Sequence, residues 1–128
     1  MEITDGEREV LQATMSAAGC RPEIVRGGFE ALAKEWDAFV LRCETGYRGR
    51  SEEFLQDLSV RTILARVLLR LPRAIARKVE EPILALDYRY RAIPRNNERF
   101  LLSERLQSRH PAGRDFWLYG LPASARLS

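Results

Sequence analysis

The chain has 128 residues, of which 45% are hydrophobic and 30% charged. This length and composition predict one folded domain over residues 1–128 and exclude an intrinsically disordered chain. No apolar run approaches the roughly 20 residues that a membrane-spanning helix needs. The polar, acidic start "MEITDGEREV" is also unlike a secretory signal. We therefore expect a cytoplasmic protein that does not bind membranes.

The net charge of +3 is unevenly distributed along the chain. Residues 1–60 hold 12 acids and 7 bases, whereas residues 61–128 hold 6 acids and 14 bases. The bases are almost all arginine, because lysine occurs only at positions 34 and 78. Arginine binds carboxylates and phosphates through its planar fork. A GC-rich genome would give the same arginine bias, so the bias alone does not indicate a partner.

The first predicted helix lies in "TDGEREVLQATMSAAG", where Thr4 or Asp5 can cap the start and Gly19 can end it. Its apolar residues recur at helical spacing: Val10, Leu11, Met15 and Ala18. The following "CRPEIVRGG" predicts an irregular connector, because Pro22 and the glycine pair 27–28 break regular structure.

The clearest helical pattern is "FEALAKEWDAFVLRCETG", which ends at Gly46. Its apolar residues step by three and four, which predicts one buried face: Phe29, Leu32, Trp36, Phe39, Val40 and Cys43. The face that packs against this helix must be apolar too.

The next stretch, "GYRGRSEEFLQDLSVRTI", predicts a turn, a short helix at 52–58, a bend, and a second helix at 60–71. Ser51 suits the first helix cap and Ser59 suits a second one. The expected core positions are Phe54, Leu55, Leu58, Ile63, Leu64, Val67, Leu68 and Leu71.

A long helix is predicted in "LPRAIARKVEEPILALDYRYRAIP", with Pro72 at its start and Pro94 as its stop. Pro82 lies inside the pattern and should kink or split the helix. The buried stripe is expected at Ile75, Val79, Ile83, Leu86, Tyr90 and Ile93.

The remainder predicts a weaker helix capped by Asn96 or Asn97, then a loop through Pro111 and Gly113. The aromatic tail "FWLYGLP" is open to three interpretations: a docked tail, a short strand or an exposed segment. The whole pattern predicts an all-α fold, a compact single-domain bundle of four or five helices with an aromatic C-terminal tail.

The sequence carries no recognisable pattern for catalysis or metal binding. The single histidine, His110, precedes Pro111 in a predicted loop, and no nucleophile motif accompanies it. Cys20 and Cys43 lack CxxC spacing, so we expect two free thiols, with a disulfide as the open alternative. "GYRGR" lacks the spacing and lysine of a phosphate-binding loop. We expect no enzyme, no cofactor and no metal site.

Two groups of arginines are candidates for binding phosphates. The first group is Arg66, Arg70, Arg73 and Arg77, and the second is Arg89, Arg91, Arg95 and Arg99, with Tyr88 and Tyr90 interleaved. Such surfaces can grip phosphates and stack bases, but they can equally be solvated charge. No nucleic-acid-binding motif accompanies them. A small nucleic-acid-binding factor using this basic half is therefore the alternative function.

Four phrases, in order, carry a family resemblance: "EWDAFVLRCETGY", "EEFLQDLSVR", "RLP" and "LDYRYRAI". They resemble a group of small helical bacterial proteins with the pattern W…GY…(F/Y)LxDLxxR…LP…LDxR(F/Y)RxA. The similarity covers roughly residues 29–93, with "FWLY" a looser match. The resemblance implies no settled activity, and an immunity or antitoxin-like role would suit such proteins. The matching positions are Trp36, Gly46, Tyr47, Phe54, Asp57, Leu58, Arg61, Asp87, Arg89 and Tyr90.

Helix capping does not explain Tyr47, Asp57 or Arg61. Asp57 and Arg61 are four residues apart and can pair along one helix, and Arg61 could also reach Asp87. Tyr47 could offer its hydroxyl group to the same cluster. We favour a buried bracing network over an exposed binding patch. Further candidates for partner binding or bracing are Arg89, Arg91, Trp117 and Tyr119.

These observations together predict a non-catalytic protein-binding module. The favoured partner is another protein, such as a bacterial toxin that the module inhibits. The uneven charge supports a polar interface, because complementary potentials speed encounter. The oligomeric state stays open.

Overall fold

The computed structural model describes residues 3–96, 117, 121–122 and 125–127. Within these residues it contains five helices: α1 (Asp5–Ala17), α2 (Pro22–Gly27), α3 (Phe29–Thr45), α4 (Ser51–Arg70) and α5 (Arg73–Ala92). It also contains four two-residue strands: β1 (Arg48–Gly49), β2 (Arg95–Asn96), β3 (Leu121–Pro122) and β4 (Arg126–Leu127). The predicted all-α bundle is confirmed.

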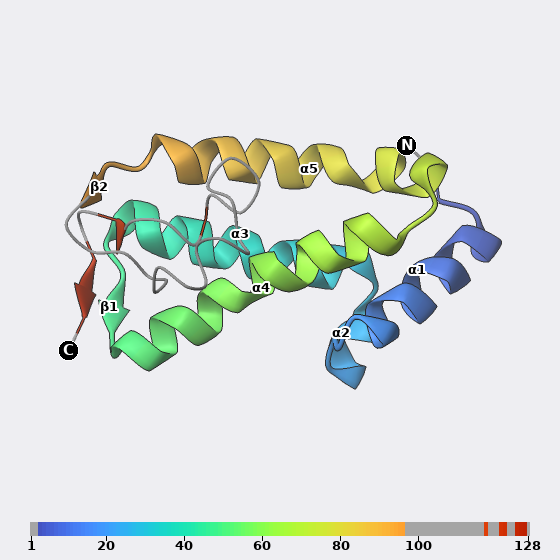
Figure 1. The fold of residues 1–128 in the computed structure, drawn as a ribbon, viewed down its shortest axis with the longest axis horizontal. Coiled ribbons are helices and arrows are strands. Elements are labelled where there is room, and N and C mark those ends of the chain that lie inside the picture. The colour runs from blue at the N-terminus through green and yellow to red at the C-terminus, as the bar shows by residue number, and fades with distance from the viewer. Residues whose placement is uncertain (1–2, 97–116, 118–120, 123–124, 128) are drawn as a thin grey trace, which may run out of the picture.

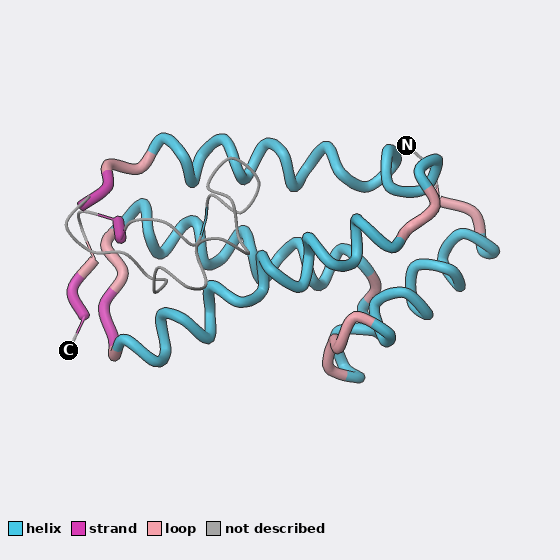
Figure 2. The backbone as a smooth tube through the Cα atoms, in the orientation of Figure 1, coloured by secondary structure: helices cyan, strands magenta, loops and turns pink. Residues whose placement is uncertain are grey.

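The three long helices form the body of the molecule, with α3 packed against both α4 and α5 (Figure 1). Helix α4 runs back along α3, and α5 then returns in the direction of α3. Helices α1 and α2 cover one end, whereas the short strands lie at the opposite end (Figure 2). The α3 stripe of apolar residues is therefore central because two other helices bury it.

Helix α1 begins where the sequence predicts. Thr4 caps it through a capping box, in which the Thr4 hydroxyl accepts from the Glu7 amide at 3.1 Å. The Glu7 carboxylate in turn accepts from the Thr4 amide at 3.0 Å. Leu11 and Met15 are buried, but Val10 is 38% exposed and lies outside the core.

The predicted connector after α1 is wrong, because Pro22–Gly27 is a six-residue helix. Pro22 is in its first turn, where a missing backbone N–H costs nothing. Gly28 then adopts a φ of +81°, a conformation that favours glycine, and separates α2 from α3. The proline and the glycine pair thus bound a helix instead of interrupting structure.

Helix α4 is one continuous helix, so the predicted bend at Ser59 is wrong. Arg50 is its N-cap and Ser51 its first residue, with no side-chain capping bond. The Ser59 hydroxyl donates to the Gln56 carbonyl inside the same helix, which leaves no cap for a second helix. Leu55 is 44% exposed and does not point to the core, unlike its buried neighbour Phe54.

Helix α5 runs unbroken through Pro82, so the proline does not split it. Pro82 is exposed, and its missing N–H leaves the Lys78 carbonyl without its usual helical donor. At the start of α5, Pro72 is the N-cap residue, and at the end Pro94 follows the C-cap Ile93. The predicted start, stop and buried stripe of this helix are confirmed.

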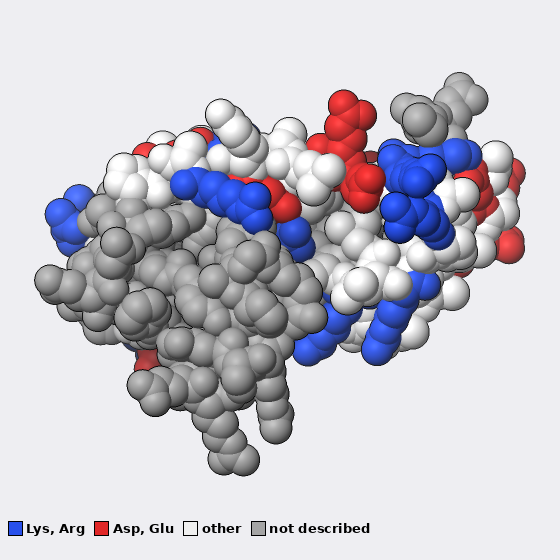
Figure 3. Space-filling model, turned by 45° about the horizontal axis from the view of Figure 1, so that its top comes forward, with Lys and Arg blue, Asp and Glu red and all other residues white. Residues whose placement is uncertain are grey.

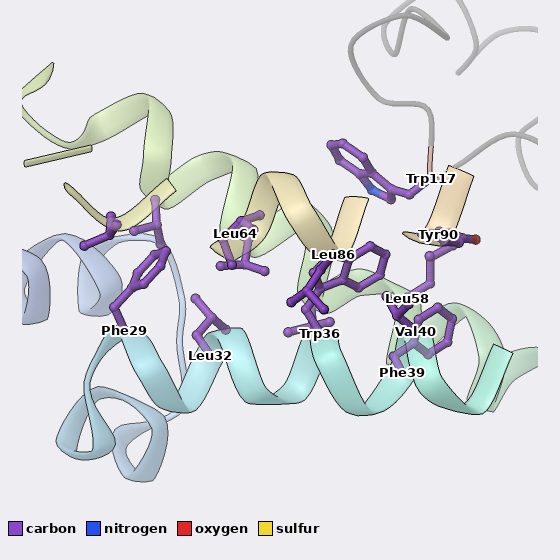
Figure 4. Close-up of a cluster of buried hydrophobic side chains, with 14 of the residues drawn as sticks. Phe29, Leu32, Trp36, Phe39, Val40, Leu58, Leu64, Leu86, Tyr90 and Trp117 are labelled. Carbon is purple, nitrogen blue, oxygen red and sulfur yellow. The ribbon is translucent and has the colours of Figure 1, made fainter. Parts of the chain in front are cut away.

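An aromatic cluster fills the space between α3 and its neighbours (Figure 4). Trp36 is fully buried, with its ring 5.7 Å from that of Phe39 and 5.1 Å from that of Tyr90. Tyr47 and Phe54 meet edge to face at 5.0 Å. Trp117 is also buried, at 2% exposure, and comes from the C-terminal part of the chain.

Two short strand pairs hold the C-terminal segments against the body. Strands β1 and β4 are parallel, with Arg48 opposite Arg126, and the Arg126 amide donates to the Tyr47 carbonyl at 2.8 Å. Strands β2 and β3 are antiparallel, with Arg95 opposite Pro122. The described parts of the aromatic tail are thus docked, in part as strands. The helix predicted after Asn96 and the loop through Pro111 and Gly113 lie outside the described residues.

Candidate functional site

Tyr47 and Asp57 meet at the junction of the α3–β1 turn and the first half of α4. The Tyr47 hydroxyl donates to Oδ2 of Asp57 at 2.6 Å. Nη1 of Arg42, from α3, donates to the same oxygen at 3.1 Å. The Arg42 guanidinium lies 4.2 Å from the centre of the Tyr47 ring, in cation–π geometry. We call these three residues the Tyr47 cluster.

The Tyr47 cluster combines a buried ring with charges that reach solvent. The Tyr47 residue is fully buried, whereas the Asp57 side chain is 39% exposed and that of Arg42 50% exposed. Burial, together with the hydrogen bond to Asp57, raises the pKa of Tyr47 to about 12. The Tyr47 hydroxyl is therefore protonated at neutral pH and holds Asp57 in place at the surface.

Arg61 does not pair with Asp57 but with Asp87 of α5. Its Nε and Nη2 atoms donate to the two carboxylate oxygens of Asp87 at 2.8 and 2.7 Å. Nε1 of Trp36 donates to the same carboxylate at 3.1 Å. Arg61 is 7% exposed and Asp87 5% exposed. The fork geometry and the third donor satisfy the buried carboxylate with three hydrogen bonds, which offset its removal from water.

Trp117 covers this buried pair from the C-terminal segment. Its ring centre lies 4.3 Å from the Arg61 guanidinium carbon, and its Nε1 donates to the Thr62 hydroxyl at 3.0 Å. Both tryptophans of the chain therefore contact the Arg61–Asp87 pair. We call Trp36, Arg61, Asp87 and Trp117 the buried pair cluster.

The expected single network is thus two separate clusters. Arg61 does reach Asp87, as the sequence suggested, and the two side chains bridge α4 to α5 next to Trp36 of α3. Asp57, in contrast, joins α4 to α3 through Arg42 and to the turn through Tyr47. The buried bracing interpretation fits the buried pair cluster, whereas Asp57 is placed at an accessible surface.

Arg89 bridges α5 to α3 on the outside of the bundle. Its guanidinium donates to both carboxylate oxygens of Glu44, in one case from Nε at 3.2 Å, and to Asp37 at 3.4 Å. The hydrogen bonds from Arg89 lower the pKa of the Glu44 carboxyl group. Arg91 lies on the exposed side of the same helix. Tyr119 falls outside the described residues.

The two arginine groups differ in their placement. In the first group, Arg66 and Arg70 end α4 whereas Arg73 and Arg77 begin α5, so Pro72 divides the predicted stripe between two helices. All four are exposed, and Lys and Arg side chains gather over this end of the molecule in Figure 3. Arg70 also donates to the Ala17 carbonyl at the end of α1, at 2.8 Å.

The second arginine group is not a continuous basic surface in the described residues. Its first member, Arg89, is held by two carboxylates, and Tyr90 is fully buried. Tyr88 is 77% exposed and is the aromatic side chain of this group that reaches solvent. Arg99 lies outside the described residues.

Two members of the Tyr47 cluster, Arg42 and Asp57, line a groove of about 440 Å³ between α3 and α4. Its floor is apolar and comes from Ile24, Leu32, Phe39, Val60 and Ile63. Arg42 and Asp57 line one end, and Arg21 and Glu35, which form an ion pair, line the other. We call this feature the α3–α4 groove.

Cys20 also lines the α3–α4 groove and is half-buried. Burial, and to a smaller extent the charge of Glu35, raises the pKa of the Cys20 thiol, so the thiolate is disfavoured. Cys20 and Cys43 are both free cysteines, and the disulfide alternative is wrong. The thiol therefore contributes a small apolar surface to the groove.

The sequence did not indicate this groove, because its lining comes from three separated segments. Cys20 and Arg21 follow α1, Glu35 and Arg42 lie on α3, and Asp57 lies on α4. Glu35 and Arg42 are seven residues apart, which places them on one side of a helix. This seven-residue spacing was the one feature of the sequence that could have indicated the groove.

No family model, curated protein or solved structure matches this chain. In the part of the chain that the structure describes, no three His, Cys, Asp or Glu side chains are grouped to hold a metal ion. In that same part, no helix has both the length and the apolar character that a bilayer crossing requires.

Proposed function

We propose that this chain is a non-catalytic protein-binding module and that its partner docks over the α3–α4 groove. The single observation that carries the proposal is the combination of an apolar floor with a charged rim in one groove of about 440 Å³. Protein interfaces have this composition, with an apolar centre and a polar, solvent-accessible rim. Arg42, which lines the groove, belongs to a residue type that is enriched where binding energy concentrates.

The rim sets the chemistry of the partner. It carries two acids and two bases, which form two ion pairs. Glu35 pairs with Arg21, and Asp57 pairs with Arg42. A partner that inserts apolar side chains and offers charges of both signs would complement the floor and the rim. A bacterial toxin that this chain inhibits is a partner class that would suit a small helical protein of this kind.

Substitutions at exposed alanines test the groove without disturbing the core. Ala38 lines the groove and is exposed, so Ala38→Trp fills the groove while leaving the buried face of α3 intact. Ala85→Trp, at an exposed alanine of α5 that does not line the groove, is the matched control. Both variants should keep the circular dichroism spectrum and the thermal midpoint of the parent.

The three proteins are used as baits in lysate of the organism that encodes the chain, with and without nuclease. We expect a partner that the parent and Ala85→Trp retain after nuclease treatment and that Ala38→Trp loses. The same set of proteins on all three baits would overturn the proposal. Loss of all captured material on nuclease treatment would favour the second candidate instead.

The second candidate function is nucleic-acid binding at the end where α4 meets α5. The four exposed arginines 66, 70, 73 and 77 support it, as does the exposed Tyr88 farther along α5. Filter binding of single- and double-stranded DNA and RNA at several salt concentrations tests it. Each phosphate contact should add about 0.7–0.9 to the slope of log affinity against log salt. Binding that disappears near physiological salt would leave only non-specific attraction.

A further inference from the structure

A second hollow lies on another side of the bundle, between α1, α3 and α5, with a volume of about 330 Å³. Its apolar wall comes from all three helices and from the residue before the α1 cap: Ile3, Leu11, Phe29, Ala33, Val79 and Pro82. A volume of this size is at the small end of the range for sites that bind small molecules. We call it the three-helix pocket.

The chain's two lysines, 34 and 78, both line the three-helix pocket. They are 44 positions apart in the sequence, on α3 and α5, in a chain whose other 19 bases are arginines. Arg8 of α1 lines the pocket as a third cation. Three cations from three helices therefore converge on one apolar pocket.

The acids nearby do not neutralise all of this charge. Nζ of Lys78 donates to the Glu7 carboxylate at 2.8 Å, which leaves two of its three N–H donors for other acceptors. Glu30 is the acid that lines the pocket itself. Among the described residues, Arg8 and Lys34 form neither an ion pair nor a side-chain hydrogen bond. The pocket thus has positive charge that is not committed within the fold.

We propose that the three-helix pocket binds an amphipathic anion, with a short apolar chain against Phe29 and Val79 and a carboxylate at Lys34 and Arg8. An apolar wall alone would accept any hydrocarbon of suitable size. The uncommitted cations make an anionic head group the matching chemistry, because charge-assisted hydrogen bonds are stronger than neutral ones. This site is separate from the α3–α4 groove, so it stands or falls independently of the proposed partner.

Isothermal titration calorimetry with three eight-carbon probes tests the head-group preference. The probes are octanoate, octanol and octyltrimethylammonium, which share the chain length and differ in charge. We expect octanoate to bind at least about tenfold more tightly than either of the others, which is the effect of one charge-assisted hydrogen bond. Equal affinity for the three probes, or no binding of octanoate, would overturn the proposal.

Three variants locate the site. Lys34→Gln removes an exposed cation of the pocket and should weaken octanoate binding about tenfold without changing octanol binding. Arg26→Gln removes an exposed cation of α2 that does not line the pocket and should change neither affinity. Ala33→Trp fills the pocket and should abolish both. If Lys34→Gln binds octanoate as the parent does, the assignment is wrong, and the thermal midpoints of the variants show whether they fold.

Discussion

The substitution Asp87→Asn tests how much the buried pair cluster contributes to stability. The asparagine keeps the shape of the side chain and an acceptor for Trp36, but it removes the charge that pairs with Arg61. Both members of the pair are less than a tenth exposed, so Arg61 would keep a buried positive charge without its counter-ion. Breaking a buried pair in this way costs about 3–5 kcal/mol. That is a large part of the roughly 5–15 kcal/mol that stabilises a typical domain.

A second variant separates the unpaired charge from the lost packing. Arg61→Met combined with Asp87→Leu removes both charges and replaces them with apolar side chains of comparable size. It should be less destabilised than Arg61→Met alone or Asp87→Leu alone, because buried pairs replaced by apolar residues are often neutral. The Trp36 N–H, left without its acceptor, adds a cost of about 1–3 kcal/mol in the double variant.

Stability is measured by unfolding in urea, which is monitored by circular dichroism and by tryptophan fluorescence. Both tryptophans contact the cluster, so the fluorescence signal reports on it directly. Glu81→Gln, at an exposed acid of the same helix, is the control and should stay within about 0.5 kcal/mol of the parent. The reasoning fails if Asp87→Asn is as stable as this control, or if the double variant is less stable than both Arg61→Met and Asp87→Leu.

Four further outcomes are expected. Trp36→Ala should lower the free energy of unfolding by about 3–5 kcal/mol, because it empties a fully buried site; an unfolding midpoint close to the parent's would contradict this. Asp57→Ala should cost less, about 1–3 kcal/mol, because it leaves the buried Tyr47 hydroxyl without its acceptor; a cost equal to that of Asp87→Asn would be inconsistent with the exposure of Asp57. The ultraviolet titration of Tyr47 should have its midpoint near pH 12. The free energy of unfolding should fall between pH about 10 and 12, because in this range the Tyr47 hydroxyl loses its proton in the unfolded chain but keeps it in the folded one. In an NMR titration the Glu44 carboxyl pKa should rise in Arg89→Gln, so the stability lost on acidification should be smaller in that variant than in the parent.

The helices could be predicted because most of them have one apolar stripe with a clear start and stop. In α3 the seven-residue steps from Phe29 to Trp36 to Cys43 place these residues on one face, so the buried face of the helix is unambiguous. Gly46 marks the end of the helix. Helix α2 was missed because Pro22 and the following glycines can either interrupt structure or bound a short helix. Local sequence does not distinguish the two, and packing against α3 decides.

The errors in α4 have a related cause. Ser51 and Ser59 both have good capping chemistry, and a cap at each would make two helices. In the continuous helix, Phe54, Leu58, Arg61 and Leu64 follow one stripe, and Leu55 falls beside it toward solvent. Arg61 was expected to be buried, but the bend predicted at Ser59 kept it from being read as part of one stripe with Phe54 and Leu58.

Part of the candidate site was also accessible from the sequence. Tyr47, Asp57 and Arg61 were recognisable as residues that capping left unexplained, and Asp87 was recognisable as a second acid for Arg61. The contact between Arg61 and Asp87 was among the expected ones. The pairing of Asp57 with Arg42 was not, because Arg61 was a nearer candidate than Arg42, which lies 15 positions away on another helix. The groove and the pocket depend on how three or more segments pack, and no local pattern carries that information.

The pairing of β1 with β4 has a consequence for the order in which the molecule folds. It joins residues 48 and 126, about three times farther apart along the chain than Arg61 and Asp87. Closing the longer loop costs about 1 kcal/mol more in chain entropy, and strands of only two residues give little in return. This edge should therefore close after the helices have packed and open before they do. The Arg126 amide, bonded to Tyr47, would exchange its hydrogen with solvent much faster than the amides of α3, and each opening would release the turn that presents the Tyr47 cluster.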